Sequence, residues 1–143
     1  AVSGGGKSTL SLAAHQVGAS VMSDEYALID PETGFVTGWH RPVRILTDDG
    51  GVDRHDIAFA SDPLPVGCIA FVAHEGGSAN AWSEVSRGVA VGRLMEHTIC
   101  AVARPNDSLD AALFAVESGS TVEGTRGDAA DAVAPLLALT AKR

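Results

Sequence analysis

Residues 1–9 read Ala1-Val2-Ser3-Gly4-Gly5-Gly6-Lys7-Ser8-Thr9, and this stretch is the most informative part of the chain. Glycines allow the backbone to wrap closely around a polyphosphate with its N–H groups pointing inward. In loops of this pattern the lysine, here Lys7, reaches the β- and γ-phosphates, and the hydroxyl that follows, here Ser8, holds Mg²⁺. A helix beginning at this point aims the positive end of its dipole at the same anion. The stretch therefore predicts a phosphate-binding loop that runs into a helix.

The loop departs from the usual pattern at its first position and in what precedes it. Ala1 stands where the pattern has its first glycine. Such a loop hangs from a buried parallel strand, of which the chain offers only Ala1 and Val2, so we expect an N-terminally truncated domain that lacks this strand. The alternative is a glycine-rich turn with an incidental Gly-Lys-Ser. If the loop is functional, its nucleotide-binding residues are Ser3, Gly4, Gly5, Gly6, Lys7, Ser8 and Thr9.

Beyond the loop, apolar segments alternate with polar turns. We expect helices over residues 9–17, 83–96, 106–118 and 128–142, and strands over 19–23, 26–30, 35–38, 42–46, 66–73 and 120–124. The run 66–73, VGCIAFVA, is typical of a fully buried strand. Residues 47–56 are polar and contain glycine, and we interpret them as a loop; residues 99–103 fit a short strand or a helix tail. The order of elements predicts a single α/β domain over residues 1–143.

The charge and the composition exclude two classes of partner. The 143 residues carry a net charge of −8 and contain no basic stripe, which argues against nucleic-acid binding. No apolar run is long enough to span a membrane and no signal peptide is visible, so we expect a cytoplasmic protein. Cys68 and Cys100 lie alone in apolar strings, where buried free thiols are expected rather than a disulfide or a metal pair.

An acidic pair follows the loop after one helix and one short strand. Asp24 and Glu25 end the expected strand 19–23. Enzymes with a phosphate loop need an acid near the lysine and the serine, either to hold Mg²⁺ or to accept a proton from the attacking hydroxyl. Two adjacent acids can divide this work, one as metal ligand and one as base. The alternative is an ordinary acidic turn at the end of a strand.

The run of residues 3–25, SGGGKSTLSLAAHQVGASVMSDE, resembles the nucleotide-binding core of bacterial HPr kinase/phosphorylase and its relatives. Those proteins have a Ser-Gly-x-Gly-Lys-Ser loop, one helix, a glycine, a short apolar strand and then an acidic pair. The related phosphoenolpyruvate carboxykinases share the style of the loop. The specific match is confined to this run. It implies a PEP-carboxykinase-like P-loop domain with a mixed sheet flanked by helices.

The resemblance also implies roles for the matched residues. Gly4, Gly6, Lys7 and Ser8 would bind the phosphates of ATP and Mg²⁺. Asp24 would correspond to the first family aspartate, the base toward a serine hydroxyl. Glu25 replaces the second, a metal-linked position that is usually aspartate. The chain shows no copy of the family's downstream signature, which favours a related kinase with another target over phosphorylation of HPr itself.

Phosphoryl transfer also requires positive charge on the far side of the γ-phosphate. The candidates are Arg41 and Arg44, which precede the polar segment 47–56, with Arg104 a weaker third. For Arg41 and Arg44 the alternative is a solvated strand edge or a salt bridge.

These observations predict an ATP- and Mg²⁺-dependent kinase, a transferase that phosphorylates a hydroxyl, serine above all, on a protein or a small molecule. Its catalytic residues would be Lys7, Asp24, Arg41 and Arg44, and its metal ligands Ser8 and Glu25. One alternative is a carboxykinase-like or other metabolic phosphotransferase. Another is a nucleotide-binding regulatory module without transfer activity. Homo-oligomer formation stays open.

Overall fold

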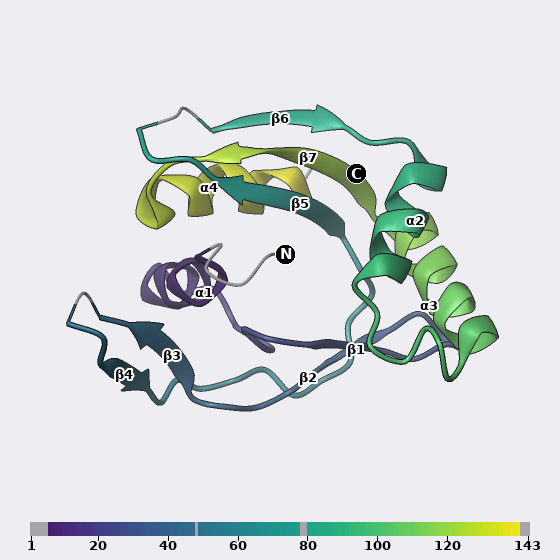
Figure 1. Ribbon diagram of the computed structural model, residues 1–143, viewed down its shortest axis with the longest axis horizontal. Coiled ribbons are helices and arrows are strands. Elements are labelled where there is room, and N and C mark those ends of the chain that lie inside the picture. The colour runs from purple at the N-terminus through teal and green to yellow at the C-terminus, as the bar shows by residue number, and fades with distance from the viewer. Residues whose placement is uncertain (1–5, 48, 78–79, 141–143) are drawn as a thin grey trace.

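A computed structural model describes residues 6–47, 49–77 and 80–140 of the chain. These residues contain four helices and seven strands, and the strands form three small sheets, so the expected mixed α/β class is confirmed (Figure 1). The elements in chain order are α1 (Lys7–Gln16), β1 (Ala27–Ile29), β2 (Val36–Gly38), β3 (Val43–Leu46), β4 (Val52–His55), β5 (Cys68–His74), β6 (Ala81–Glu84), α2 (Arg87–Glu96), α3 (Pro105–Ser118), β7 (Ser120–Arg126) and α4 (Ala129–Thr140).

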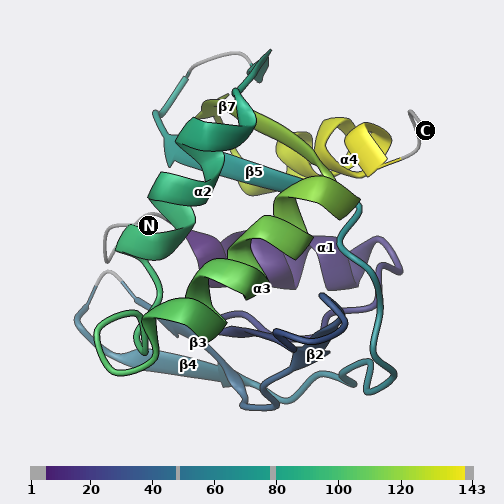
Figure 2. The same cartoon turned by 90° about the vertical axis from the view of Figure 1, so that its right-hand side faces the viewer.

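The largest sheet is mixed and has the strand order β5-β7-β6. Strand β7 runs parallel to β5, with Cys68 opposite Ser120 and His74 opposite Arg126, and antiparallel to β6. Helices α2 and α3 lie side by side at one end of this sheet (Figure 2). Their buried residues Ala90 and Val116 join Val85 in one core cluster. The sheet is therefore mixed and flanked by helices, as expected.

A second core cluster joins the two ends of the described chain. Ala13 of α1 packs with Ala129 and Val133 of α4, all of them buried. Small side chains let the two helices approach closely, which seats α1 beside the sheet that α4 covers. The β1–β2 and β3–β4 hairpins lie on the other side of α1 (Figure 1). Helix α1 thus occupies the middle of the molecule, and β3 contacts it.

Several expected elements agree with the structure and differ only at their ends. Helices α1, α3 and α4, and strands β1, β2, β3 and β7, lie where the sequence predicts them. Helix α3 begins one residue earlier than expected, with Arg104 at the N-cap and Pro105 in the first turn. Proline at the first helical position is favourable because its missing N–H would have no partner there.

Other expectations were wrong. Residues 19–23 form no strand but a single bridge between Val21 and Phe59. Residues 47–56 are not one loop, because β4 pairs with β3 across a short turn. Strand β6 takes residues 81–84, so α2 begins later than the predicted helix 83–96. The apolar strand β5 is half-buried rather than fully buried, since in the described part of the chain it pairs with β7 along one edge only.

The expectations for residues 99–103 and for the thiols also need correction. Residues 99–103 form turns, and Ile99 and Val102 are 78% and 97% exposed. The cysteines are free, as expected, but Cys68 is only half-buried and Cys100 is exposed. In the ranges that the structure describes, no helix combines the length and the apolar character needed to cross a membrane.

Two aspartates stabilise the turns of the small hairpins. In the β1–β2 turn the carboxylate of Asp30 accepts the backbone N–H of Glu32 at 2.8 Å, which is the main reason why its pKa lies below the usual value. In the β3–β4 turn, Asp49 accepts the hydroxyl of Thr47 and the backbone N–H of Gly51. Both hydrogen bonds lower the pKa of Asp49, and the bond from the Thr47 hydroxyl has the larger effect. Both carboxylates therefore stay ionised at neutral pH and keep the turns closed.

Candidate functional site

The start of α1 borders a large open cleft. Gly6 is the N-cap of the helix with a φ of 68°, and its carbonyl accepts the N–H of Leu10 at 3.0 Å. The cleft has a volume of about 710 Å³. It is lined by Gly6, Lys7, Ser8, Thr9, Asp24, Glu25, Tyr26, Arg41, Pro42, Arg44, Ile45, Leu46 and His97. Every predicted site residue within the described ranges thus borders one cleft. The other loop residues, Ser3, Gly4 and Gly5, lie outside those ranges.

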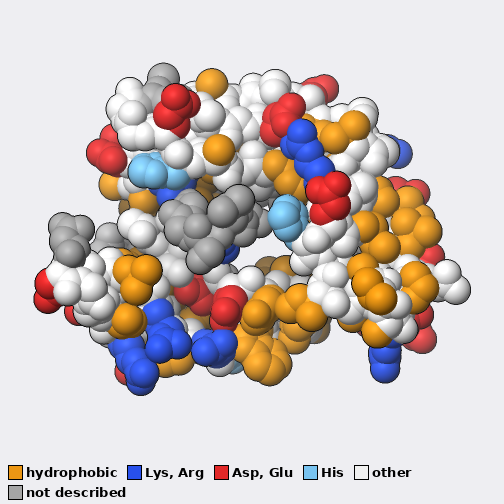
Figure 3. All heavy atoms as spheres, in the orientation of Figure 1, with side chains coloured by type: hydrophobic (Ala, Val, Ile, Leu, Met, Phe, Trp, Pro, Cys, Tyr) orange, Lys and Arg blue, Asp and Glu red, His pale blue; other side chains and the backbone are white. Residues whose placement is uncertain are grey.

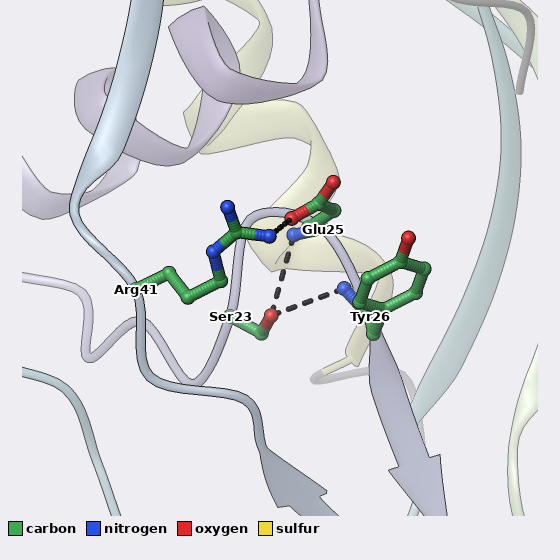
Figure 4. A network of polar contacts seen from close by, with 4 residues as sticks. All are labelled: Ser23, Glu25, Tyr26 and Arg41. Carbon is green, nitrogen blue, oxygen red and sulfur yellow. Dashed lines mark hydrogen bonds and ion pairs between the residues drawn. The ribbon is translucent and has the colours of Figure 1, made fainter.

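The acidic pair stands on a turn rather than at the end of a strand. The Ser23 hydroxyl oxygen accepts the backbone N–H groups of Glu25 at 3.2 Å and Tyr26 at 3.1 Å, which closes the turn (Figure 4). Gly38 of β2 packs closely against the backbone just before this turn, because a Cβ at Gly38 would lie 2.0 Å from the carbonyl oxygen of Met22. Only glycine allows this close approach. The sequence ahead of the acids therefore encodes the turn that presents them.

Glu25 and Arg41 form an ion pair at the edge of the cleft. The Arg41 Nη1 lies 2.7 Å from the Glu25 Oε2, and the two side chains are 43% and 45% exposed (Figure 4). Exposed pairs of this kind stabilise a protein by only about 0.2–1 kcal/mol. A metal ion at Glu25 or a phosphate at Arg41 can therefore replace the pair at little cost. The structure confirms the salt-bridge alternative for Arg41. This ion pair engages both Arg41, predicted to be catalytic, and Glu25, predicted to be a metal ligand.

Asp24 and Lys7 are two charged side chains of the cleft that form no ion pair in the described residues. Within the described residues, neither side chain has a hydrogen-bond or ion-pair partner. Asp24 is half-buried, whereas Lys7 is exposed at the first position of α1. A carboxylate and an ammonium group without partners, on one cleft at a helix N-terminus, can accept a proton and bind a phosphate respectively.

Oxygen donors suited to Mg²⁺ line the same cleft. Among the residues that the structure describes, no group of three or more His, Cys, Asp and Glu side chains could hold a metal ion. A magnesium ion commonly uses one or two carboxylates together with the phosphates of its substrate. Ser8, Asp24 and Glu25 fit that kind of site, in which a nucleotide completes the coordination.

Sequence reasoning missed Arg126, which ends β7 beside the N-cap of α1. This arginine is 2% exposed, and its Nη2 donates to the Gly6 carbonyl at 2.9 Å while its Nη1 donates to the Gly127 carbonyl at 2.8 Å. A Cβ at Gly6 would lie 2.3 Å from that Nη2. Arg126 thereby ties the sheet to the first turn of α1. No clear signal for it was present in the sequence, because the predicted strand stopped at Gly124 and Arg126 lay beyond its end.

We expect Gly6→Ala to weaken binding of Mg-ATP more than Gly18→Ala does. Both glycines have positive φ, which costs an alanine about 1–2 kcal/mol. The new Cβ also meets Arg126 at position 6, whereas at Gly18 no described atom lies within 4 Å. Titration with a fluorescent ATP analogue measures the affinity, and thermal unfolding reports the strain that both variants share. Equal affinities in the two variants would contradict the role of Gly6.

Of the other two candidate arginines, Arg44 lines the cleft and Arg104 does not. Arg44 lines the cleft from β3 as expected. Arg104 does not line it; its side chain is 74% exposed and lies 4.0 Å from Asp107. His97, which follows α2, also borders the cleft, although no sequence signal distinguished it from the other histidines. The cationic side chains of the cleft are therefore Lys7, Arg41 and Arg44.

Comparisons with known proteins found no match among family models, curated proteins or solved structures.

Proposed function

We propose that the protein is an ATP- and Mg²⁺-dependent kinase of the HPr-kinase-like type, with a P-loop kinase fold, that phosphorylates a hydroxyl group. The observation that carries this proposal is the meeting of two segments at one cleft. The start of α1 brings Lys7 and Ser8, and the Ser23 turn brings Asp24 and Glu25. A phosphate-binding helix N-terminus facing two carboxylates is the arrangement that phosphoryl transfer to a hydroxyl requires.

Each described residue has a distinct task in the proposed reaction. The backbone at Gly6 and the Lys7 ammonium group bind the phosphates of ATP at the N-terminus of α1. The Asp24 carboxylate accepts the proton of the acceptor hydroxyl as its oxygen bonds to the γ-phosphorus. The bond from that phosphorus to the bridging oxygen breaks, and ADP leaves with the electron pair. The products are the phosphorylated acceptor, ADP and the proton taken up by Asp24.

Mg²⁺ would be held by Ser8 and Glu25 together with the nucleotide. When bound, it neutralises charge that develops on the phosphate oxygens. An ion held at Glu25 would leave Arg41 free of its ion pair, and Arg41 and Arg44 would then be available to bind the phosphates. The ion pair therefore keeps the Glu25 carboxylate and the Arg41 guanidinium group close to the positions in which they would act.

Transfer of label from [γ-³²P]ATP tests the proposal. With Mg²⁺ and serine-containing protein or peptide acceptors, we expect acid-stable phosphoserine to form. Label that hydroxylamine removes would indicate an acyl phosphate and support a carboxykinase-like phosphotransferase instead. Tight Mg-ATP binding without label on any acceptor would support a regulatory module. EDTA in a parallel reaction controls for the metal requirement.

A further inference from the structure

The β3–β4 hairpin exposes a face that its own fold does not use. Arg44 stands opposite Arg54 and Leu46 stands opposite Val52 in the strand register. Residues two apart along a strand point to the same side, so these four side chains share one face, here called the hairpin face. The other side of the hairpin faces the interior, where Val43 is fully buried.

The composition of the hairpin face is unfavourable for the isolated protein. Like charges directly opposite each other on a strand pair are destabilising. Neither Arg44 nor Arg54 has a hydrogen-bond or ion-pair partner in the described ranges. Beside them, Leu46 and Val52 are 78% and 45% exposed. Two unpaired guanidinium groups next to two exposed aliphatic side chains indicate a surface that a partner covers.

The hairpin face is unusual in a protein with a net charge of −8. Figure 3 shows Lys and Arg side chains gathered at the lower left, where Figure 1 places β3 and β4, with hydrophobic side chains beside them. An anionic partner would be attracted to this positive patch while the acidic remainder of the surface repels it.

The hairpin face is continuous with the candidate site. Arg44 and Leu46 line the same cleft as Lys7 and Asp24, whereas Arg54 and Val52 lie beyond its lining. A ligand on the hairpin face thus extends from open surface to the mouth of the cleft. An acceptor small enough to lie wholly in the cleft would leave Arg54 and Val52 uncovered, so the arrangement favours an extended polypeptide.

We propose that the hairpin face docks a segment of an acceptor protein in which acidic and aliphatic residues lie near the phosphorylated serine. An acidic side chain pairs with Arg54, beyond the cleft, and an aliphatic side chain covers Leu46 and Val52, while Arg44 at the cleft remains available to the phosphates. The proposal rests on the proposed function, because docking places the serine hydroxyl at the cleft that holds Asp24. It adds the class of acceptor, an acidic protein segment, to that function.

Binding of short fluorescein-labelled peptides tests the docking. One peptide carries glutamates and leucines around a serine, a second carries lysines in place of the glutamates, and a third carries serines in place of the leucines. Fluorescence anisotropy with the wild-type chain and a non-hydrolysable Mg-ATP analogue should show the first peptide binding about tenfold more tightly than either other one. Equal affinities for the three peptides would overturn the proposal.

Two substitutions outside the cleft lining locate the binding. Arg54→Glu should weaken the glutamate peptide about fivefold to tenfold and strengthen the lysine peptide, since it reverses one charge of the pair. Val52→Ser should weaken the leucine peptides only. The matched control is Arg87→Glu, which makes the same charge change at an exposed arginine of α2 and should leave all affinities unchanged. If Arg87→Glu and Arg54→Glu have the same effect, the proposal fails.

Affinity for the Mg-ATP analogue, measured on the same samples, separates this inference from the proposed function. Peptide discrimination without any transfer of label would leave the docking face standing and count against the kinase. Transfer of label to serine at equal rates from acidic and basic peptides would support the kinase and overturn the docking face.

Discussion

Asp24→Asn is expected to slow phosphoryl transfer by about 10²–10⁴-fold, the range typical for loss of a general base. The asparagine keeps the shape of the side chain and its place in the cleft, but it cannot accept the proton of the acceptor hydroxyl. Because the loop and Lys7 remain, we expect Mg-ATP still to bind. Single-turnover transfer of label measures the rate, and titration with a fluorescent ATP analogue measures the affinity.

Glu25→Gln is the matched control, because it removes the adjacent carboxylate that Arg41 already contacts. It should raise the Mg²⁺ concentration needed for half-maximal transfer. Asp24→Asn should instead lower the transfer rate even at saturating Mg²⁺. An unchanged transfer rate in Asp24→Asn would refute the assignment of the base.

Lys7→Ala should weaken Mg-ATP binding by about 10- to 100-fold, as expected for loss of charge-assisted hydrogen bonds to phosphate. Lys7 is exposed and has no partner in the described part of the chain, so its removal should leave the folded state intact. Titration with the fluorescent analogue gives the affinity, and circular dichroism with thermal unfolding verifies the fold.

Arg87→Ala is the control for Lys7→Ala, since Arg87 is also an exposed cation at the first position of a helix. It removes the same charge from a helix N-terminus that does not border the cleft. Equal losses of affinity in the two variants would show a general charge effect, and the phosphate-binding assignment of Lys7 would then be wrong.

Local signals in the sequence predicted the elements of the site well. The glycine-rich run ahead of an alanine- and leucine-containing segment predicted α1, and the short return to Asp24 and Glu25 placed an acidic pair near its start. These predictions succeeded because helix formation and tight turns depend on residues a few positions apart. All predicted site residues in the described ranges border one cleft, although the strand expected at 19–23 is a bridged turn.

Weak local signals explain the errors in the fold. Strand β4 has the sequence VDRH, and β6 has AWSE, neither of which shows the apolar alternation of a half-buried strand. Each becomes a strand because a partner supplies hydrogen bonds: β3 for the first and β7 for the second. The preference for a strand at such positions comes from pairing and context rather than from intrinsic propensity.

The residues of the candidate site occur in short segments of the sequence, whereas their assembly depends on contacts between residues far apart in the chain. The identities of Gly6, Lys7 and Asp24 follow from spacing over a few turns of chain. The bond from Arg126 to the Gly6 carbonyl joins residues 120 positions apart, and the pair of Arg41 with Glu25 joins residues 16 apart. No local pattern encodes such contacts, because they form only after helix packing and strand pairing have closed the intervening chain. The start of α1 was therefore recognisable in the sequence, whereas the buried arginine bonded to Gly6 and the exposed hairpin face became visible only in the tertiary structure.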